Sequence, residues 1–411
     1  MNNNEKNRLP RGWHLALLVL CFLSFVLYAM YFNSFGPNAQ AAMRFFKIDE
    51  AKNGLILTVQ SVGCLILTIL LGLFGERLHK IRAIAFGLGL MGLAGLCVGL
   101  IPAMRSGSAY ALMMGFSVFA GVGFITVDLL MNSVVADVFP AQKDTLLPVV
   151  HAFYGVGSML APIFVTALVT PERPESFARP YLIIGAAAIP VCLLLLGVSR
   201  RVSPETPYAD MAAIRARARQ NPSEIFREGK AWLYLLTCFF YLIFQTGVTA
   251  WLPTFCQETR GYDFTAAGLM VTVYFVGALI IRLLSPVIYR KISVERFLVL
   301  SLLLSAAVFL VFLFVPLPLG AGRLVILLLG LLQGAAVPSI VILCCSAFPE
   351  RTASASSLVV FGVSLAGMAG PALMGYMMER TGYVSAMLLA VASLLLSVVL
   401  LPKARRVKDN G

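Results

Sequence analysis

Two fully charged side chains, Asp128 and Arg282, stand inside long apolar runs of this sequence, and the neutral but titratable His151 stands in another. Ionisable groups are costly in hydrocarbon, so each one needs an internal partner or a water-filled cavity. Asp128 and Asn132 are four residues apart and share one face of a helix. Burial of the carboxyl favours its protonated form and a nearby cation favours the carboxylate, so its protonation can follow conformation. We predict that Asp128 couples proton movement; a static hydrogen bond to a neighbouring helix is the structural alternative.

Two further titratable side chains are assigned to proton coupling with Asp128. His151 lies about one turn inside the end of its run and can hydrogen-bond Asp128 or a substrate hydroxyl, although a buried, satisfied histidine fits equally well. Arg282 can bind an anionic substrate or pair with Asp128. Alternatively, its long stem can carry the charge to the lipid headgroups.

Polar uncharged and aromatic side chains in the apolar runs are candidates for solute binding. Amides donate and accept hydrogen bonds, and an aromatic ring can cover the apolar face of a sugar. Each of these residues can equally connect two helices. The predicted solute-binding residues are Asn33, Gln40, Gln60, Asn132, Gln245, Trp251, Tyr274 and Gln333.

The composition indicates that helices in a membrane position these residues. Of the 411 residues, 59% are apolar and 12% are charged, about half the charged fraction usual in soluble domains. Apolar runs of about 20 residues are long enough to cross a hydrocarbon core as helices. Because backbone in lipid must satisfy its own hydrogen bonds, the predicted fold class is all-α and polytopic, with twelve transmembrane helices. They are expected near residues 13–33, 53–73, 83–101, 109–135, 146–169, 180–199, 231–254, 265–287, 296–316, 322–347, 354–377 and 384–402.

The basic residues predict the orientation of these spans. Twenty-two of the 32 lysines and arginines fall on the side that carries both termini, so both termini are expected in the cytoplasm, in a plasma membrane of the bacterial inner-membrane kind. The net charge of +13 is therefore interpreted as topology and contact with anionic lipid, not as a nucleic-acid surface. The eight cysteines lack metal-ligand spacing, and no metal, cofactor or catalytic constellation is predicted, so the chain is not expected to be an enzyme.

An internal repeat divides the sequence. Residues 54–70 match residues 268–284 at an offset of 214, with identity at nine of seventeen positions, including two glycine pairs (54/268 and 63/277) and one threonine pair (58/272). An offset of 209 aligns 158–162 with 367–371. We therefore predict two related six-helix bundles, an N-terminal half (1–199) and a C-terminal half (231–411), joined by a cytoplasmic linker (200–230).

The loop after the second span reads Gly72-Leu-Phe-Gly-Glu76-Arg77-Leu-His79-Lys80-Ile-Arg82. It resembles the signature loop of the major facilitator superfamily, with Glu76 where Asp is usual and His79 where a second Gly is usual. The resemblance implies that this loop holds the cytoplasmic ends of the two halves together in the outward-facing state; the alternative is that its charges only enforce topology. The implied gating residues are Gly72, Glu76, Arg77, Lys80 and Arg82.

Two further motifs resemble the fucose permease branch of that superfamily: Asp128-Leu-Leu-Met-Asn132 and His151-Ala-Phe-Tyr-Gly155-Val-Gly157. This resemblance implies a monomeric secondary transporter that works by alternating access and couples uptake of a sugar or similar hydroxylated metabolite to the proton gradient. Its partners would be the solute, protons and membrane lipids. Two alternatives stay open: a proton-antiport exporter of drugs or metabolites, and a non-transporting receptor that keeps the carrier fold.

Overall fold

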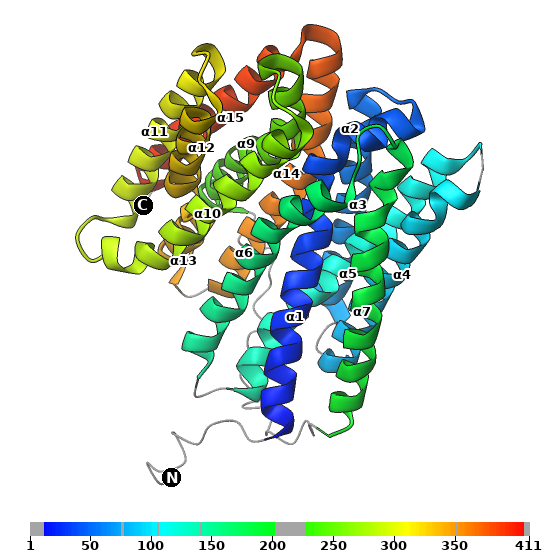
Figure 1. Cartoon of the computed structure of the whole chain (residues 1–411). Helices are drawn as coiled ribbons and strands as arrows, with labels where there is room; N and C mark the ends of the chain where they lie inside the picture. The colour runs from blue at the N-terminus through cyan, green and yellow to red at the C-terminus, as the bar shows by residue number, and fades with distance from the viewer. Residues whose placement is uncertain are drawn as a thin grey trace. The chain divides into compact units, whose positions relative to one another are not determined.

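The computed structural model describes residues 12–74, 78–104, 107–139, 142–201, 227–349 and 352–406. Within these ranges every regular element is a helix (Figure 1). Twelve helical stretches of the described residues are long and apolar enough to cross a membrane. The predicted all-α fold class and its twelve spans are confirmed.

The helices of the N-terminal half include one short addition to the predicted spans. Beyond the first span, α2 adds a helix of twelve residues. The elements are α1 (Trp13–Asn33), α2 (Phe35–Phe46), α3 (Glu50–Phe74), α4 (Lys80–Leu100), η2 (Ile101–Met104), α5 (Ala109–Val138), α6 (Lys143–Leu168), η3 (Pro174–Phe177) and α7 (Ala178–Ser199).

The C-terminal half contains one interrupted span. The run predicted at 322–347 forms two helices, α12 and α13, because the helix ends at Gln333 and resumes at Ala336. The elements are α9 (Gly229–Arg260), α10 (Phe264–Ile288), α11 (Val294–Phe314), α12 (Leu319–Gln333), α13 (Ala336–Ala347), α14 (Thr352–Thr381) and α15 (Tyr383–Arg406).

The described residues form two compact units. The first unit lies within Met1–Phe32, Val62–Ser158 and Ala178–Gln220, and the second within Asn33–Ser61, Met159–Phe177 and Asn221–Gly411. In the first unit α4 packs against α5 and α7. In the second unit α9 packs against α14 and α15, and α2 packs against α9 and α10. Short segments of the N-terminal half therefore pack directly with the C-terminal half inside the second unit.

The turn between α2 and α3 has a clear local cause. Lys47 ends α2 in the left-handed conformation, with φ of 55°. Asp49 then accepts a hydrogen bond from the backbone N–H of Lys52 at 2.7 Å, and its carboxylate pairs with the Lys52 ammonium at 3.0 Å. The backbone hydrogen bond, followed by the Lys52 side chain, holds the pKa of Asp49 below its ordinary value. This capped start fixes the direction of α3 and the place of its first residue, Glu50.

The repeated glycines mark close helix contacts in each unit. A Cβ atom built on Gly63 of α3 would lie 2.3 Å from the carbonyl oxygen of Val118 in α5. A Cβ built on its repeat partner, Gly277 of α10, would lie 2.3 Å from the carbonyl oxygen of Leu327 in α12. Val118 and Leu327 are themselves 209 positions apart, which is the second offset of the sequence repeat. Equivalent glycines thus admit equivalent backbones, and close packing of this kind stabilises helix association in membranes.

We expect Gly277→Ala to lower the free energy of unfolding by about 1–3 kcal/mol, because the new methyl group meets backbone that cannot turn aside. Gly63→Ala should have a similar effect. The matched control is Gly115→Ala, inside α5, where an added Cβ meets no atom within 4 Å and alanine improves helix propensity. Apparent unfolding midpoints of the purified variants in detergent check this; a control that unfolds as early as Gly277→Ala contradicts the prediction.

Candidate functional site

Three of the predicted residues and one tyrosine form a hydrogen-bonded chain in the first unit. The Tyr28 hydroxyl of α1 donates to Oδ1 of Asp128 on α5 at 2.8 Å. One turn further along α5, Asn132 Nδ2 donates to the backbone oxygen of Asp128 at 2.7 Å. Asn132 Oδ1 lies 2.9 Å from Nε2 of His151 on α6. Asp128, Asn132 and His151 therefore belong to one polar chain that spans three helices.

Aromatic rings surround this polar chain. The Tyr28 ring has its centroid 4.9 Å from that of Phe25 and 4.9 Å from that of Phe124. The imidazole of His151 meets Phe25 edge to face at 5.5 Å. Tyr28 is buried, whereas Asp128, Asn132 and His151 are each partly exposed. A carboxyl that has a fixed hydroxyl donor and still reaches the surface of its unit can exchange a proton with water.

A second polar cluster lies in the second unit and contains predicted solute-binding residues. Tyr274 of α10 donates its hydroxyl to Oε1 of Gln333, the last residue of α12, at 3.0 Å. The Gln245 side chain of α9 lies near the same hydroxyl. Tyr241, also on α9, donates to the backbone oxygen of Gln333 at 3.0 Å. Two of the predicted amides and Tyr274 are thus brought together.

The interruption between α12 and α13 supplies acceptors for this cluster. A Cβ on Gly334 would lie 2.2 Å from the backbone oxygen of Ala278, so only glycine allows α10 to approach the break this closely. Arg282, also on α10, donates from Nε to the Gly334 oxygen at 3.2 Å. Side chains thereby satisfy carbonyl groups that the interrupted helix leaves open, as membrane proteins require.

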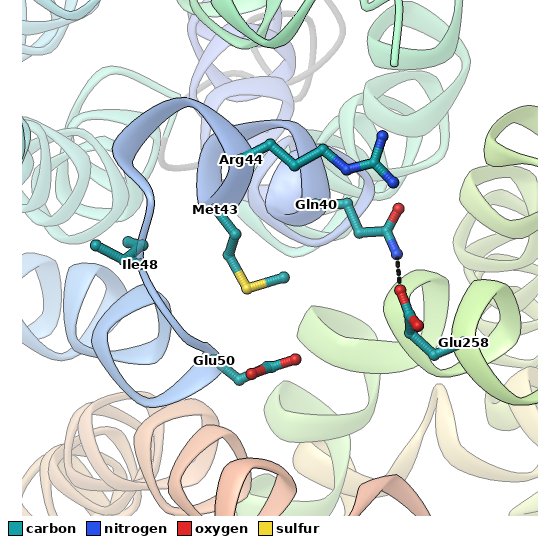
Figure 2. Close-up of a pocket in the computed structure, with 6 residues that line it drawn as sticks. All are labelled: Gln40, Met43, Arg44, Ile48, Glu50 and Glu258. Carbon is teal, nitrogen blue, oxygen red and sulfur yellow. Dashed lines mark hydrogen bonds between the residues drawn. The ribbon is translucent and has the colours of Figure 1, made fainter. Parts of the chain in front are cut away.

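A cavity of about 280 Å³ lies at the second unit's α2–α3 turn. Figure 2 shows Glu50 and Glu258 on opposite sides of it, with the Glu258 carboxylate turned toward the Gln40 amide. The Gln40 amide donates to Oε1 of Glu258 at 2.5 Å (Figure 2), and the Tyr383 hydroxyl donates to Oε1 of Glu50 at 2.6 Å. The other lining residues are Met43, Arg44 and Ile48. Both hydrogen bonds connect an N-terminal-half helix with a C-terminal-half helix.

The remaining predicted solute-binding residues occupy interior or terminal positions in the second unit. Trp251 is fully buried, and its indole N–H donates to the backbone oxygen of Pro371 at 2.9 Å. Gln60 is buried, and within the described ranges its Nε2 atom has no hydrogen-bond partner. Asn33 is the last residue of α1 and is partly exposed.

The predicted gating loop lies partly outside the described residues. Glu76 and Arg77 fall outside them, while Gly72 lies in the last turns of α3. Lys80 begins α4 after an extended His79, and Arg82, two residues later, is exposed. The latch role assigned to these residues stays a prediction.

Two repeat-related hydrogen bonds join the sequence halves inside the second unit. Thr58 of α3 donates to the backbone oxygen of Met368 in α14 at 2.7 Å, and Thr272 of α10 donates to that of Met159 in α6 at 3.0 Å. The two threonines are 214 positions apart and the two methionines 209, the offsets of the repeat. We call these two bonds the threonine clasps.

Several of these contacts were not assigned by sequence reasoning. Tyr28 and Tyr241 sit in apolar runs where a phenol gives no sign of the acceptor it will meet. Glu50 and Glu258 lie at the ends of their helices, where a carboxylate usually faces water. The threonine pair did carry a signal, since it is repeated in the sequence. Within the described ranges, no group of three or more His, Cys, Asp or Glu residues is arranged to hold a metal ion.

Comparison with known families identifies the class of protein. The profile of the Major Facilitator Superfamily matches residues 20–351 and 265–410, which is most of the sequence. The chain belongs to the Major Facilitator Superfamily, whose members are membrane transporters of small solutes.

Its curated relatives are distant. It is 23% identical to the uncharacterized transporter YycB of Bacillus subtilis over 359 residues, which are 85% of this chain and 83% of that protein. It is 24% identical to Bypass of stop codon protein 6 of Saccharomyces cerevisiae over 288 residues, which are 65% of this chain and 55% of that protein. The chain thus spans little more than half the length of the yeast relative.

Solved structures share the fold at low sequence identity. A bacterial homolog of the human lysosomal transporter Spinster, inward-facing and occupied, aligns with a TM-score of 0.79 at 16% identity, covering 97% of this chain and 98% of that one. The D-xylose–proton symporter aligns at 0.76 and 14% identity over 95% and 97%. The E. coli fucose:proton symporter aligns at 0.63 and 20% identity over 96% and 99%. The resemblance to the superfamily and its sugar carriers is therefore confirmed at the level of the fold.

We expect Thr58→Val and Thr272→Val to lower the free energy of unfolding by similar amounts, roughly 0.5–1.5 kcal/mol each, because each removes one hydrogen bond between helices. Thr68→Val is the matched control, since the Thr68 hydroxyl bonds only to Cys64 of its own helix among the described residues. Unfolding midpoints in detergent measure the difference. Equal losses in all three variants would show that the clasps add nothing beyond an ordinary helical threonine.

Proposed function

We propose that this chain takes up a small hydroxylated solute by alternating access and that the proton gradient drives the uptake. The observation that carries the proposal is the Tyr28–Asp128–Asn132–His151 chain. Within the described part of the first unit, no basic side chain forms an ion pair with Asp128, so its charge is not already neutralised by a fixed cation. A proton is the simplest neutralising partner for a carboxyl held in a membrane span.

His151 and Asn132 extend this proposal from proton binding to coupling. The histidine titrates near neutral pH when unperturbed, and its ring contacts Asn132 on the same helix face as Asp128. Protonation of either group changes which atoms of the chain donate and which accept. A solute hydroxyl that competes for these atoms would therefore bind with an affinity that depends on the proton, which is the requirement for coupled transport.

The second polar cluster and the clasps supply the other parts of the proposed cycle. Gln245, Tyr274 and Gln333 offer amide and phenol groups suited to a hydroxylated solute. The threonine clasps and the Glu50–Tyr383 and Gln40–Glu258 bonds connect the two sequence halves. They lie toward the helix ends that the distribution of basic residues predicts to be outside the cell. Their breakage would accompany opening to that side.

The comparisons support the direction of the proposal. Two structures of the same fold are named as proton symporters of D-xylose and of fucose. We extend this to the present chain as uptake into the cytoplasm by a monomer with both termini inside, in the plasma membrane of a bacterium. No cofactor other than the proton gradient is required.

We expect Asp128→Asn to abolish gradient-driven uptake into proteoliposomes of whichever solute, among D-xylose, L-fucose and D-gluconate, the parent exchanges in counterflow. That counterflow should stay measurable in the variant, because the amide only loses the ability to carry the proton. Asp263→Asn, the same chemical change at the exposed N-cap of α10, is the control and should transport normally, because asparagine caps a helix as well as aspartate does. Asp128→Asn indistinguishable from the parent would remove the coupling role. Solute driven out by an inwardly directed proton gradient would identify an exporter, and saturable binding without translocation would identify a receptor.

A further inference from the structure

We propose that the transported solute is a monoanion, a hydroxylated carboxylate, and that Arg282 and Gln333 bind its carboxylate group. The inference rests on the proposed transport function and names the chemical class of its solute. At the break between α12 and α13, the backbone oxygens of Gln333 and Gly334 are bonded, whereas side-chain donors of Arg282 and Gln333 are left over.

Arg282 is the first of these donors. Its Nε is occupied by the Gly334 oxygen, but neither terminal guanidinium nitrogen donates to any residue of the described second unit. No carboxylate of that unit's described residues lies within 4 Å of it. Arg282 is partly buried within a span, where an uncompensated cation is costly. The two terminal nitrogens of a guanidinium match the two oxygens of a carboxylate.

Gln333 is the second donor and an independent observation. Its side chain is fully buried, and Tyr274 holds its Oε1, which leaves Nε2 pointing away from that bond with no acceptor among the described residues. A buried amide N–H without an acceptor destabilises the folded state by about 1–3 kcal/mol. Such a group is retained at low cost when a ligand supplies the missing acceptor.

The two donors lie at the same break in the helix. Arg282 is fixed to Gly334, and Gln333 is the residue immediately before it. The backbone oxygen of Gly334 already accepts a hydrogen bond from Arg282, and that of Gln333 accepts one from Tyr241. At this break a ligand therefore meets the N–H groups of Arg282 and Gln333 beside backbone oxygens that are already bonded, which favours an acceptor-only group such as a carboxylate over a sugar hydroxyl, which must also donate.

The charge count favours a single negative charge. Arg282 offers one positive charge, and a dianionic phosphate bound there would keep one charge uncompensated in a poorly solvated place. The repeat adds a further argument. Thr68 occupies the equivalent position of α3, and its hydroxyl bonds to Cys64 of its own helix. The helix packing that the two halves share therefore does not require a cation at this position. Arg282 is thus a feature of the C-terminal half alone.

The test is a thermal-shift titration of the full-length protein in detergent with hydroxylated monocarboxylates and their neutral counterparts. The acids are D-gluconate, D-glucuronate, quinate and L-lactate, each compared with its methyl ester or amide and with D-glucose, and inorganic phosphate is added separately. We expect at least one acid, and not its neutral counterpart, to raise the unfolding midpoint.

Variants connect that shift to the site. In Arg282→Gln and in Gln333→Leu, the concentration of the same acid needed for the shift should rise on the order of 10- to 100-fold, because each loses a hydrogen bond to a charged group. Arg380→Gln, at the exposed end of α14, should respond like the parent. The midpoints without ligand report whether each variant is folded; if Arg282→Gln is not, Gln333→Leu decides the outcome.

Three results overturn the proposal: no acid stabilises the parent, a neutral sugar stabilises the parent and Arg282→Gln equally, or phosphate stabilises where the carboxylates do not. Counterflow of the same solutes separates this inference from the proposed function. Proton-driven uptake of a neutral sugar that is unchanged in Arg282→Gln would contradict the proposed monoanionic solute and would still support the proposed transport function. An acid that binds through Arg282 but never crosses the proteoliposome membrane would contradict the proposed transport function and would still support the anion-binding site.

Discussion

Hydrocarbon offers no hydrogen bonds, so each polar group in a membrane span must find its partner inside the protein, and much of this structure follows from that constraint. Hydroxyl groups such as those of Ser24, Thr126 and Ser305 turn back to the carbonyl four residues earlier. Where a helix is interrupted at Gly334, Arg282 and Tyr241 take over the carbonyl groups that the break leaves open. Within the described ranges, two of the predicted solute-binding amides, Gln60 and Gln333, each keep a buried side-chain nitrogen without a hydrogen-bond acceptor.

The same constraint explains the value of small residues. Without water to drive apolar surfaces together, helices associate through close backbone packing and direct hydrogen bonds. Gly63 and Gly277 admit a neighbouring backbone at equivalent places in the two units, and the threonine clasps add equivalent hydrogen bonds. The repeated sequence therefore shares the residues that set helix spacing, while other positions differ between its two copies, as Thr68 and Arg282 illustrate.

The fold could be predicted almost entirely from the sequence, because span length and apolar character follow directly from bilayer thickness. The candidate site could be predicted only in part. Asp128 and Asn132 were placed together because helix periodicity is local, and His151 was expected nearby, but its contact with Asn132 depends on how α6 meets α5. Tyr28 is a hundred residues from its acceptor, and no local pattern predicts that meeting. The break at Gly334 was not predicted, although Pro338 gives a local signal for it, because proline has no N–H to donate to the Gly334 carbonyl four residues earlier. The close approach of α10 at Gly334 is a tertiary contact that no local pattern predicts.

The threonine clasps connect a side chain of one sequence half with the main chain of the other. In both bonds the acceptor is a main-chain oxygen, so the side chains of Met159 and Met368 take no part in them. These hydrogen bonds therefore depend on the position of the backbone in the accepting helix and not on the type of its side chains. Neither bond involves a titratable group. Substitutions can accumulate on the accepting helices without weakening these hydrogen bonds, and changes in pH do not alter them. The two copies of the repeat can therefore differ widely in sequence and still keep the same pair of hydrogen bonds between them.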